Sequence, residues 1–453
     1  MALDPKAFKA YDVRGIYPSE LDEAGAYAVG RAYVEQFEPR KITVGRDMRV
    51  SSASMAQAVI RGASDGGSEV VDVGMIGTEM LYFGVGELDA DGGVMVTASH
   101  NPKDYTGMKI VRRGALPVGG DSGLLDIRDR AQKIDAPGPE RDPAAKEVDI
   151  YPAFVDRVLS FVDVGEIKPL RVVIDAGNGM AGAMLPPILE RLPVEAVRCF
   201  FEPDGTFPNH EPNPLLPENR EFVISKVREE SADLGIAFDG DADRCFFVDD
   251  TGEFVPGDFV TALLAESMLE KEPGAKIIYD VRASWAVPDI VEKHGGEPLV
   301  NRVGHAFIKE RMRKEGALFG GEVSGHYYFR DFNQADSGTI PALLMLELVS
   351  KRDATLSEIL RPFTERYFLT GELNTPVPDV ALKLQELKEH FADEGELSHL
   401  DGISVTAEDW HMNVRPSNTE PLLRLNLEAL TPDLMERKRD EALAVIRGEG
   451  PVS

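Results

Sequence analysis

The stretch VMVTASHNPKDYTGMKI, residues 94–110, carries a serine, a histidine and a lysine around the end of an apolar run. The apolar start predicts a short buried strand, and Ser99 and His100 stand side by side where that strand ends. A serine hydroxyl is a weak nucleophile that needs a nearby base or cation, and Lys109 would return to it if residues 101–107 form a compact loop. The residues alone leave three roles for Ser99: nucleophile, phosphate ligand, or cap of a turn or helix.

A second group is acidic. In ADLGIAFDGDADRCFFVDD, residues 232–250, the carboxylates of Asp239, Asp241 and Asp243 alternate with small residues, and Arg244 follows. Three carboxylates this close repel one another unless they are solvated or hold a cation, and all-oxygen ligands suit Mg²⁺. An EF-hand loop is excluded, because Arg244 stands where such a loop needs glycine and the flanking residues predict strands rather than helices. Metal binding and a solvated acidic turn both remain open.

A third group lies in LFGGEVSGHYYF, residues 318–329, where Glu322, Ser324 and His326 alternate with small or apolar residues. In an extended segment this spacing places all three side chains on one side. A carboxylate, a hydroxyl and an imidazole together would match the hydroxyl groups of a sugar, with His326 as a possible proton carrier. A polar hairpin with a structural histidine fits the same residues.

The fourth group is NVRPSNTEPLLRL, residues 413–425. Arg415, Ser417, Asn418 and Thr419 offer a guanidinium, two hydroxyls and an amide, which is suitable chemistry for binding one phosphate. The segment has no helix-linked GxxxxGK[ST] pattern, so it is not a nucleotide P-loop. Pro-Ser-Asn is also ordinary turn chemistry, and the loop taken singly does not distinguish the two.

These loops follow a repeated alternation of apolar strand-like runs with helical patterns, which is typical of α/β units. Residues 383–395 read as an amphipathic helix, and residues 402–430 as strands around a polar loop. We therefore expect three related α/β domains and a smaller C-terminal α+β domain. Strands are predicted within 41–49, 67–78, 170–182 and 275–285, and helices at 55–67 and 260–272.

The domain limits are predicted where proline and charge concentrate. Residues 135–149 predict a connector, and further boundaries are expected near 248–258 and 359–368. The expected domains are 1–147 with the serine loop, 148–250 with the aspartate loop, 251–362 with the Glu322 loop, and 363–453 with the Arg415 loop.

The composition narrows the possible partners. The 453 residues carry a net charge of −29, which argues against nucleic acid or an anionic membrane surface. An anion site must therefore be made locally, by basic side chains, backbone N–H groups or a metal. No apolar run reaches the ~20 residues of a membrane span, and the first residues lack a signal-peptide layout. With only Cys199 and Cys245, we expect a reducing, cytoplasmic setting.

Seven motifs together resemble the α-D-phosphohexomutase family, and most closely its phosphomannomutase/phosphoglucomutase branch. They occur in the order of that family and span nearly the whole chain, whereas each alone is less specific. The shared motifs are FKAYDVRGI (8–16), VTASHNPKDYTGMKI (96–110), FDGDADR (238–244), DVR (280–282), RVGHAFIK (302–309), GEVSGH (321–326) and RPSNTE (415–420).

The resemblance implies a heart-shaped protein of four domains whose serine, Ser99 by motif, is phosphorylated in the active enzyme. It implies Mg²⁺ held by Asp239, Asp241, Asp243 and a phosphate oxygen on Ser99. The substrates would be small hexose phosphates: Ser99 passes its phosphoryl group to the free hydroxyl of the sugar. The resulting hexose 1,6-bisphosphate, also the activator, turns end for end and returns its other phosphate.

The family motifs also assign the remaining roles. Arg14, Lys109 and Arg244 would offset charge near Ser99, with Arg14, Lys109 or His326 moving protons and His100 supporting the loop. The sugar hydroxyls would be held by Glu322 and Ser324 within the loop that also contains Val323 and Gly325. The phosphate that does not react would be bound by Arg415, Pro416, Ser417, Asn418 and Thr419, aided by Tyr11, Arg282 and His305.

Departures from the family pattern are few. Lys9 and Met48 replace a frequent arginine and a frequent glycine, and Arg282 replaces a lysine of close relatives. Val323 is apolar as in mannose- and glucose-type members, whereas phosphoglucosamine mutases carry glutamine there, so that substrate is the alternative. We expect a monomer or weak homodimer.

Two other functions compete with a mutase. A haloacid dehalogenase-type phosphatase also uses aspartates, but DGDADR lacks the D-x-D-x-T/V form of its nucleophile. A non-catalytic sugar-phosphate-binding protein on the same scaffold is the other alternative.

Overall fold

The computed structural model describes residues 3–134, 145–417 and 421–448. The chain divides into two compact units, the first made of Met1–Val255 and Ser324–Leu356, the second of Pro256–Val323 and Ser357–Ser453. The chain thus passes from the second unit to the first inside the GEVSGH motif, between Val323 and Ser324. None of the helices in the described part of the chain combines the length and apolarity that crossing a membrane requires.

The first unit begins with a mixed sheet in the order β1-β5-β4-β2-β3-β7, with β6 added to β5. Its central strands β4, β2, β3 and β7 are parallel, whereas β5 runs antiparallel to β4 and to β1. The strands are β1 (Val13–Ile16), β2 (Lys41–Arg46), β3 (Glu69–Met75), β4 (Gly92–Val96), β5 (Tyr105–Arg112), β6 (Leu116–Pro117) and β7 (Ala145–Glu147).

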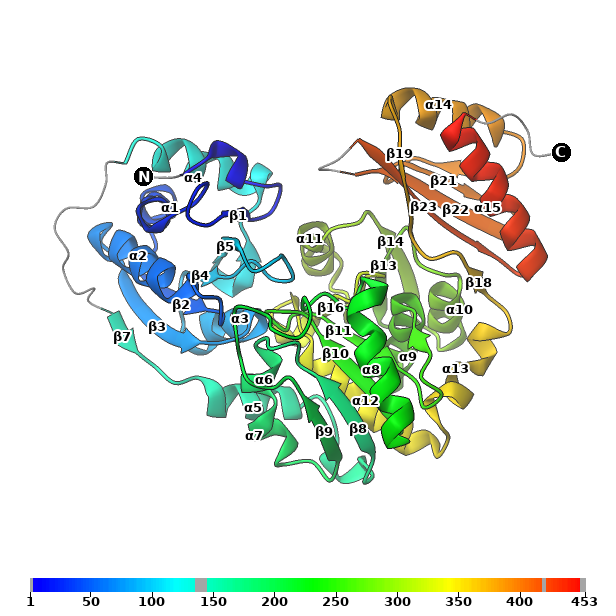
Figure 1. Cartoon of the computed structure of the whole chain (residues 1–453), viewed down its shortest axis with the longest axis horizontal. Helices are drawn as coiled ribbons and strands as arrows, with labels where there is room; N and C mark the ends of the chain where they lie inside the picture. The colour runs from blue at the N-terminus through cyan, green and yellow to red at the C-terminus, as the bar shows by residue number, and fades with distance from the viewer. Residues whose placement is uncertain (1–2, 135–144, 418–420, 449–453) are drawn as a thin grey trace. The chain divides into compact units, whose positions relative to one another are not determined.

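Helices α1 (Glu23–Phe37) and α2 (Ser52–Asp65) lie side by side next to this sheet (Figure 1). Glycine permits this close packing: a Cβ on Gly30 would stand 2.5 Å from the Val59 carbonyl oxygen. Asp22 caps α1 by accepting the backbone N–H of Gly25 at 2.8 Å. The two helices bury an apolar face against β2 and β4, which fixes the strand ends that carry the serine loop. Helices α3 (Thr78–Glu87) and α4 (Leu124–Ala131) complete this part.

A second sheet of the first unit has the order β12-β11-β10-β8-β9. Strands β9, β8 and β10 are parallel, and β11 and β12 add antiparallel to them, so β10 and β11 form a hairpin. The strands are β8 (Arg171–Asp175), β9 (Glu195–Cys199), β10 (Leu234–Phe238), β11 (Cys245–Val248) and β12 (Phe254–Val255), with helices α5 (Tyr151–Leu159), α6 (Ala181–Met184), α7 (Pro186–Leu189) and α8 (Pro217–Glu230). The unit ends with β16 (Tyr327–Phe329), β17 (Ala335–Asp336) and α12 (Thr339–Arg352).

The second unit contains a parallel α/β part and an antiparallel α+β part. The α/β part has strands in the order β14-β13-β15 and consists of α9 (Gly257–Lys271), β13 (Lys276–Asp280), α10 (Ala286–Lys293), β14 (Glu297–Asn301), α11 (His305–Glu315) and β15 (Phe319–Gly321). Helix α13 (Leu356–Thr364) leads from the boundary between the units into the last part of the chain.

The C-terminal part is a sheet in the order β18-β23-β22-β21-β20, with β19 also paired to β23. Helices α14 (Val380–His390) and α15 (Pro432–Arg447) lie together beside this sheet (Figure 1) and share an apolar core with it, which includes Trp410 and Phe391. The strands are β18 (Phe368–Leu369), β19 (Leu373–Pro376), β20 (Glu396–Ser398), β21 (Ile403–Thr406), β22 (Trp410–Pro416) and β23 (Leu422–Ala429).

The predicted fold class is confirmed, with three α/β parts followed by a C-terminal α+β part, and every predicted strand and helix is present. One short strand was not predicted. Within the predicted connector 135–149, residues 145–147 form the edge strand β7 on β3, because backbone pairing along an open edge does not require an apolar sequence. Residues 135–144 lie outside the described part of the chain. The predicted domain limits stay a prediction.

Candidate active site

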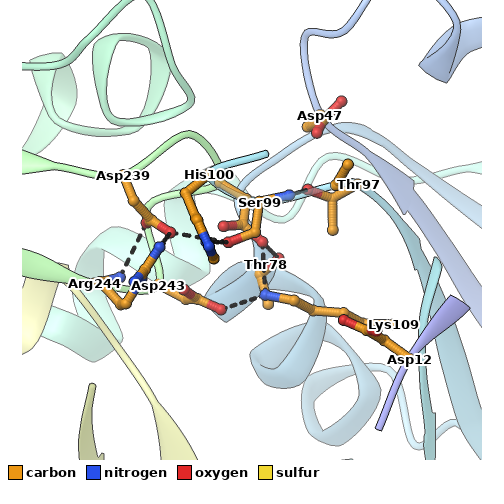
Figure 2. A network of polar contacts seen from close by, with 12 residues as sticks. Asp12, Asp47, Thr78, Thr97, Ser99, His100, Lys109, Asp239, Asp243 and Arg244 are labelled. Carbon is orange, nitrogen blue, oxygen red and sulfur yellow. Dashed lines mark hydrogen bonds and ion pairs between the residues drawn. The ribbon is translucent and has the colours of Figure 1, made fainter. Parts of the chain in front are cut away.

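Ser99 lies in a tight turn between the antiparallel strands β4 and β5. Its φ of +49° is left-handed, and its backbone N–H donates to Thr97 Oγ1 at 2.9 Å. The chain continues from this turn into a strand, which excludes the helix-cap role. The serine hydroxyl is buried and donates to Asp239 Oδ2 at 2.9 Å, with His100 Nδ1 at 3.3 Å (Figure 2).

Lys109 returns to the same place, as predicted, but its partners are the aspartates. It stands on β5 opposite Met95 of β4, so the hairpin brings it back beside the strand end. Its Nζ donates to Asp241 Oδ2 at 2.7 Å and to Asp243 Oδ2 at 2.5 Å. Figure 2 shows Lys109, Asp243, Asp239 and Ser99 pointing toward one another. The intervening loop is shorter than predicted, since β5 already begins at Tyr105.

The three aspartates occupy the turn of the β10–β11 hairpin, in which Phe238 pairs with Cys245. This confirms the predicted flanking strands. All three carboxylates are buried, and Arg244 binds Asp239 through Nε at 2.9 Å. Thr78 Oγ1 donates to Asp241 Oδ2 at 2.5 Å. Gly240 is needed here, because a Cβ at that position would lie 2.5 Å from the carbonyl oxygen of Ser99.

Positive charge is in short supply among these carboxylates. Burial alone would raise the pKa of Asp241, but the charge and hydrogen bond of Lys109 outweigh it and lower that pKa. Burial and the negative charge of Asp241 instead raise the pKa of Asp243 well above its usual value. Burial would lower the pKa of Lys109, yet Asp241 and Asp243 raise it well above the ordinary range. The cluster therefore favours a further cation.

The donor set fits a hard divalent ion. One carboxylate oxygen from each of Asp239, Asp241 and Asp243 lies within 4.8 Å of the others. Oδ1 of Asp241 and Oδ1 of Asp243 are buried and have no hydrogen-bond partner among the described residues. Buried carboxylate oxygens without a donor are costly, and a cation would satisfy them. The solvated acidic turn is thereby excluded, because these side chains are not exposed to solvent.

Two arginines hold the serine turn. Arg14, on β1, donates through Nη1 to the carbonyl of Ala98 at 3.0 Å and also to Asn101 Oδ1, while Nε binds Asp12 at 2.7 Å. Arg14 thus lies beside the serine, as the family motifs imply. Burial, together with the charges of Arg244 and Arg14, lowers the pKa of His100 well below its usual value, so that imidazole is neutral.

Arg49 is a site residue that the sequence did not reveal. Its buried guanidinium donates to four backbone carbonyls of the turn, at 2.8 Å to Ser99 and to Pro102, 3.2 Å to Tyr105 and 2.5 Å to Asn101. The signal available in the sequence was its place at the end of the stretch 41–49, after the strand predicted there and at the same sheet edge as Ser99.

The GEVSGH segment is a turn, so the extended conformation considered for it is wrong. Gly325 has a φ of +84°, which reverses the chain before β16. In the first unit, His326 forms a backbone bridge with Arg244, and its Nε2 lies 3.8 Å from Asp243 Oδ1. Ser324 Oγ lies 3.2 Å from His326 Nδ1.

In the second unit, Asp280 at the end of β13 organises the neighbouring loops. It receives two hydrogen bonds from the guanidinium of Arg282, at 2.9 and 2.8 Å, and one from the backbone of Val323 at 3.1 Å. Glu322 accepts the backbone N–H of Gly304 at 2.9 Å, next to His305, the first residue of α11. Arg282, Glu322, Val323 and His305 are thus gathered around one sheet edge.

The Arg415 loop joins β22 to β23. Arg415 stands opposite Arg424 in that hairpin, and both bind Glu372, at 3.1 and 2.6 Å. Ser417 Oγ lies 3.5 Å from Arg424 Nη2. Sequence reasoning did not identify Arg424 or Glu372 as site residues, although Arg424 lies in the same segment as Arg415, residues 413–425.

The other predicted residues are placed as follows. Pro416 is the last residue of β22, and Tyr11 is half-buried just before β1, in the first unit. Asn418 and Thr419 lie outside the described residues.

Four family models cover the chain in order. The models of the phosphoglucomutase/phosphomannomutase alpha/beta/alpha domains I, II and III match residues 5–137, 152–252 and 256–367, and that of the C-terminal domain matches 372–445. The chain belongs to the phosphoglucomutase/phosphomannomutase family. It is an isomerase of the intramolecular phosphotransferase type.

Individual relatives agree with the family. A phosphomannomutase of Salmonella montevideo is 45% identical over 449 residues, covering 97% of this chain and 98% of the relative. A protein of Xanthomonas campestris pv. campestris named "Phosphohexose mutases" is 45% identical over 444 residues, covering 98% and 99%. The solved structure of a phosphoglucomutase/phosphomannomutase family protein from Burkholderia thailandensis matches with a TM-score of 0.88 at 33% identity, covering 99% of each chain.

Proposed function

We propose that the protein interconverts hexose 6-phosphates and hexose 1-phosphates of the mannose and glucose type through a phosphorylated Ser99. The observation that carries the proposal is one buried cluster, in which the Ser99 hydroxyl bonds to Asp239 while Lys109 bonds to Asp241 and Asp243. Phosphoryl transfer depends mainly on positioning and charge neutralisation, and this cluster offers both. The names of the relatives support the substrate class.

Asp239, Asp241, Asp243 and a phosphate oxygen on Ser99 would hold Mg²⁺. The ion would supply charge neutralisation for the transferring phosphoryl group. The protein's contribution is a set of carboxylates kept dry and close together by the β10–β11 turn, with two oxygens that no described hydrogen-bond donor satisfies.

In the first transfer the bond between phosphorus and Ser99 Oγ breaks, and a bond forms to the free hydroxyl oxygen of the sugar. Lys109 and Arg14 offset negative charge around Ser99, since both stay protonated at neutral pH. Lys109 therefore acts as a cation or acid, not as a base, while it is paired with two carboxylates. Arg14 likewise acts only as a cation, which leaves His326 as the candidate to take the hydroxyl proton.

The return transfer requires the hexose 1,6-bisphosphate to present its other phosphate to Ser99. Residues that bind the sugar must then accept either orientation. By family resemblance, Glu322 and Ser324 bind its hydroxyls, and Arg415 and Ser417, with Arg282 and His305, bind the phosphate that does not react. Closure of the C-terminal part over substrate would exclude water that hydrolyses phosphoserine.

The test combines mass with turnover. Intact-protein mass spectrometry after incubation with glucose 1,6-bisphosphate should show one added phosphoryl group, absent from Ser99→Ala. A coupled assay should then detect turnover of mannose or glucose phosphates that requires Mg²⁺, with N-acetylglucosamine phosphate turned over less. Turnover by wild-type enzyme that never carries phosphate would refute the phosphoserine mechanism, and turnover of none of the three sugars would refute the function.

A further inference from the structure

Three guanidinium groups in the second unit converge on a single carboxylate, that of Glu372, just before β19. Arg424 Nη1 lies 2.6 Å from Oε1, while Arg415 Nη2 and Arg282 Nη1 lie 3.1 and 3.4 Å from Oε2. Arg282 comes from the loop after β13, and Arg415 and Arg424 face each other across β22 and β23. One short acidic side chain thus joins two separate segments of this unit.

Glu372 does not balance the charge of this cluster. Like charges placed directly opposite one another on antiparallel strands are destabilising, and Arg415 and Arg424 are such a pair. Burial and the charge of Arg282 lower the pKa of Arg415. Burial would raise the pKa of Glu372, but Arg282, Arg415 and Arg424 outweigh it and lower that pKa. The carboxylate is ionised and is shared by Arg415 and Arg424, whereas Arg282 is also offset by Asp280 and Glu322.

The arginines also keep unused donors. Nε of Arg415 and Nε of Arg424 are buried and have no hydrogen-bond partner in the described part of the chain. A carboxylate has two oxygens, whereas a phosphate monoester offers three equivalent ones to surrounding donors. Arg282 is oriented by Asp280, which binds its Nε and Nη2 and leaves Nη1 directed at Glu372.

We propose that Glu372 is an internal placeholder for the phosphate group that does not react. This rests on the proposed mutase function. In the free enzyme the Glu372 carboxylate holds the three arginines together. The incoming phosphate displaces it and takes over its hydrogen bonds.

Charge matching supports the exchange. With Glu372 displaced, the carboxylates of Asp280 and Glu322 still offset Arg282, and the guanidinium groups of Arg415 and Arg424 are left for a phosphate dianion. Glu372 is partly exposed, with 23% of its side chain accessible, so it has room to withdraw toward solvent. Asp280 is fully buried and bound by Arg282 and Val323, and it stays in place.

The first test measures inorganic phosphate binding to the full-length enzyme by isothermal titration calorimetry. Glu372→Gln removes the competing charge and should bind phosphate roughly ten-fold more tightly, which corresponds to ~1.4 kcal/mol. Glu408→Gln is the matched control, since this exposed residue in the turn between β21 and β22 changes the same charge in the same part of the chain. Unchanged or weaker phosphate binding by a folded Glu372→Gln would overturn the placeholder role.

The second test concerns Arg424. Arg424→Gln should weaken phosphate binding and raise KM for hexose phosphate about ten-fold, with kcat within about two-fold, because a charge-assisted contact to substrate is lost. Arg424→Lys should recover part of the affinity. An Arg424→Gln variant with wild-type phosphate affinity and KM would mean that phosphate does not take over the contact that Arg424 makes with Glu372, and would overturn the exchange. This test decides if Glu372→Gln does not fold.

Phosphate affinity is measured without turnover, so its outcome is separate from that of the mutase assay. If the enzyme isomerises no hexose phosphate but the two variants shift phosphate binding as stated, the proposed function fails and the arginine site stands.

Discussion

The serine–aspartate cluster of the first unit and the arginine cluster of the second have opposite arrangements of charge. In the first, carboxylates outnumber cations, and Lys109 is shared between Asp241 and Asp243. In the second, three guanidinium groups share one carboxylate, because Glu372 binds Arg282, Arg415 and Arg424. Each cluster keeps buried polar atoms without a hydrogen-bond partner among the described residues.

In both clusters, one oppositely charged side chain keeps the site folded before an ion binds. Buried like charges are costly, and removing the one opposite charge that pairs them leaves an uncompensated buried charge. A lysine or glutamate of the protein itself reduces that cost, but it satisfies only some of the buried polar atoms. The remaining unsatisfied atoms then favour binding of a divalent cation in one cluster and, by our proposal, of a phosphate in the other.

The largest expected effect is on turnover. Asp241→Asn should reduce kcat by ~100-fold or more, because the metal supplies several kcal/mol of charge stabilisation in phosphoryl transfer. The free energy of unfolding should change far less, since asparagine can still accept from Thr78 and the repulsion with Asp243 is relieved. Steady-state kinetics and urea unfolding measure the two. Equal losses of activity and stability would mean that the aspartates are structural.

The next prediction concerns Lys109, the cation shared by Asp241 and Asp243. Lys109→Met should destabilise the metal-free protein by ~3–5 kcal/mol, because it leaves buried Asp241 and Asp243 without their shared partner. Mg²⁺ should restore part of this stability, and more than it adds to the wild type. Thermal unfolding in EDTA and in Mg²⁺ gives both values. If the variant loses the same stability in EDTA and in Mg²⁺, Lys109 and the metal ion do not compensate the same carboxylates.

A smaller effect concerns a buried carboxylate whose donors are hydroxyl groups instead of a cation. Glu79 accepts hydrogen bonds from Ser337 and Thr339, and burial raises its pKa to about 8. The unfolded chain therefore loses this proton first as the pH rises. Stability should fall between the usual glutamate pKa of 4.5 and about 8, by ~1.4 kcal/mol per pH unit at most, and then level off.

Glu79→Gln keeps the size of this side chain and should flatten the decline. Urea unfolding of both proteins at ~pH 6 and ~pH 8.5 makes the comparison. Parallel declines in wild type and variant would assign the pH dependence to other groups. They would also contradict the idea that a buried carboxylate in this protein stays ionised only beside a cation.

Much of the first cluster could be predicted because its determinants are local. The apolar runs before Ser99 and on both sides of the DGDAD turn predict strands, and side chains at strand ends of α/β folds lie at a common edge. The alternation of aspartates with Gly240 and Ala242 already places three carboxylates in one short turn. These residues were identified without knowledge of any contact between them.

The conformation of the segment around Glu322 could not be predicted from its residues alone. Its alternating pattern fits an extended segment or a polar hairpin, and the structure has a turn, in which Gly325 adopts a left-handed φ. Glycine permits either conformation, so the pattern alone does not decide between them.

By itself, the sequence determined the strand-and-helix order, the motifs and the chemical character of each loop, because these depend on neighbouring residues. Only the tertiary structure decided the partners. Lys109 binds aspartates 132 and 134 residues away, Arg49 holds a turn about 50 residues away, and Glu372 meets Arg282 across 90 residues. Such contacts depend on how strands are registered and helices packed, and a charged side chain carries no local signal of the partner it will meet.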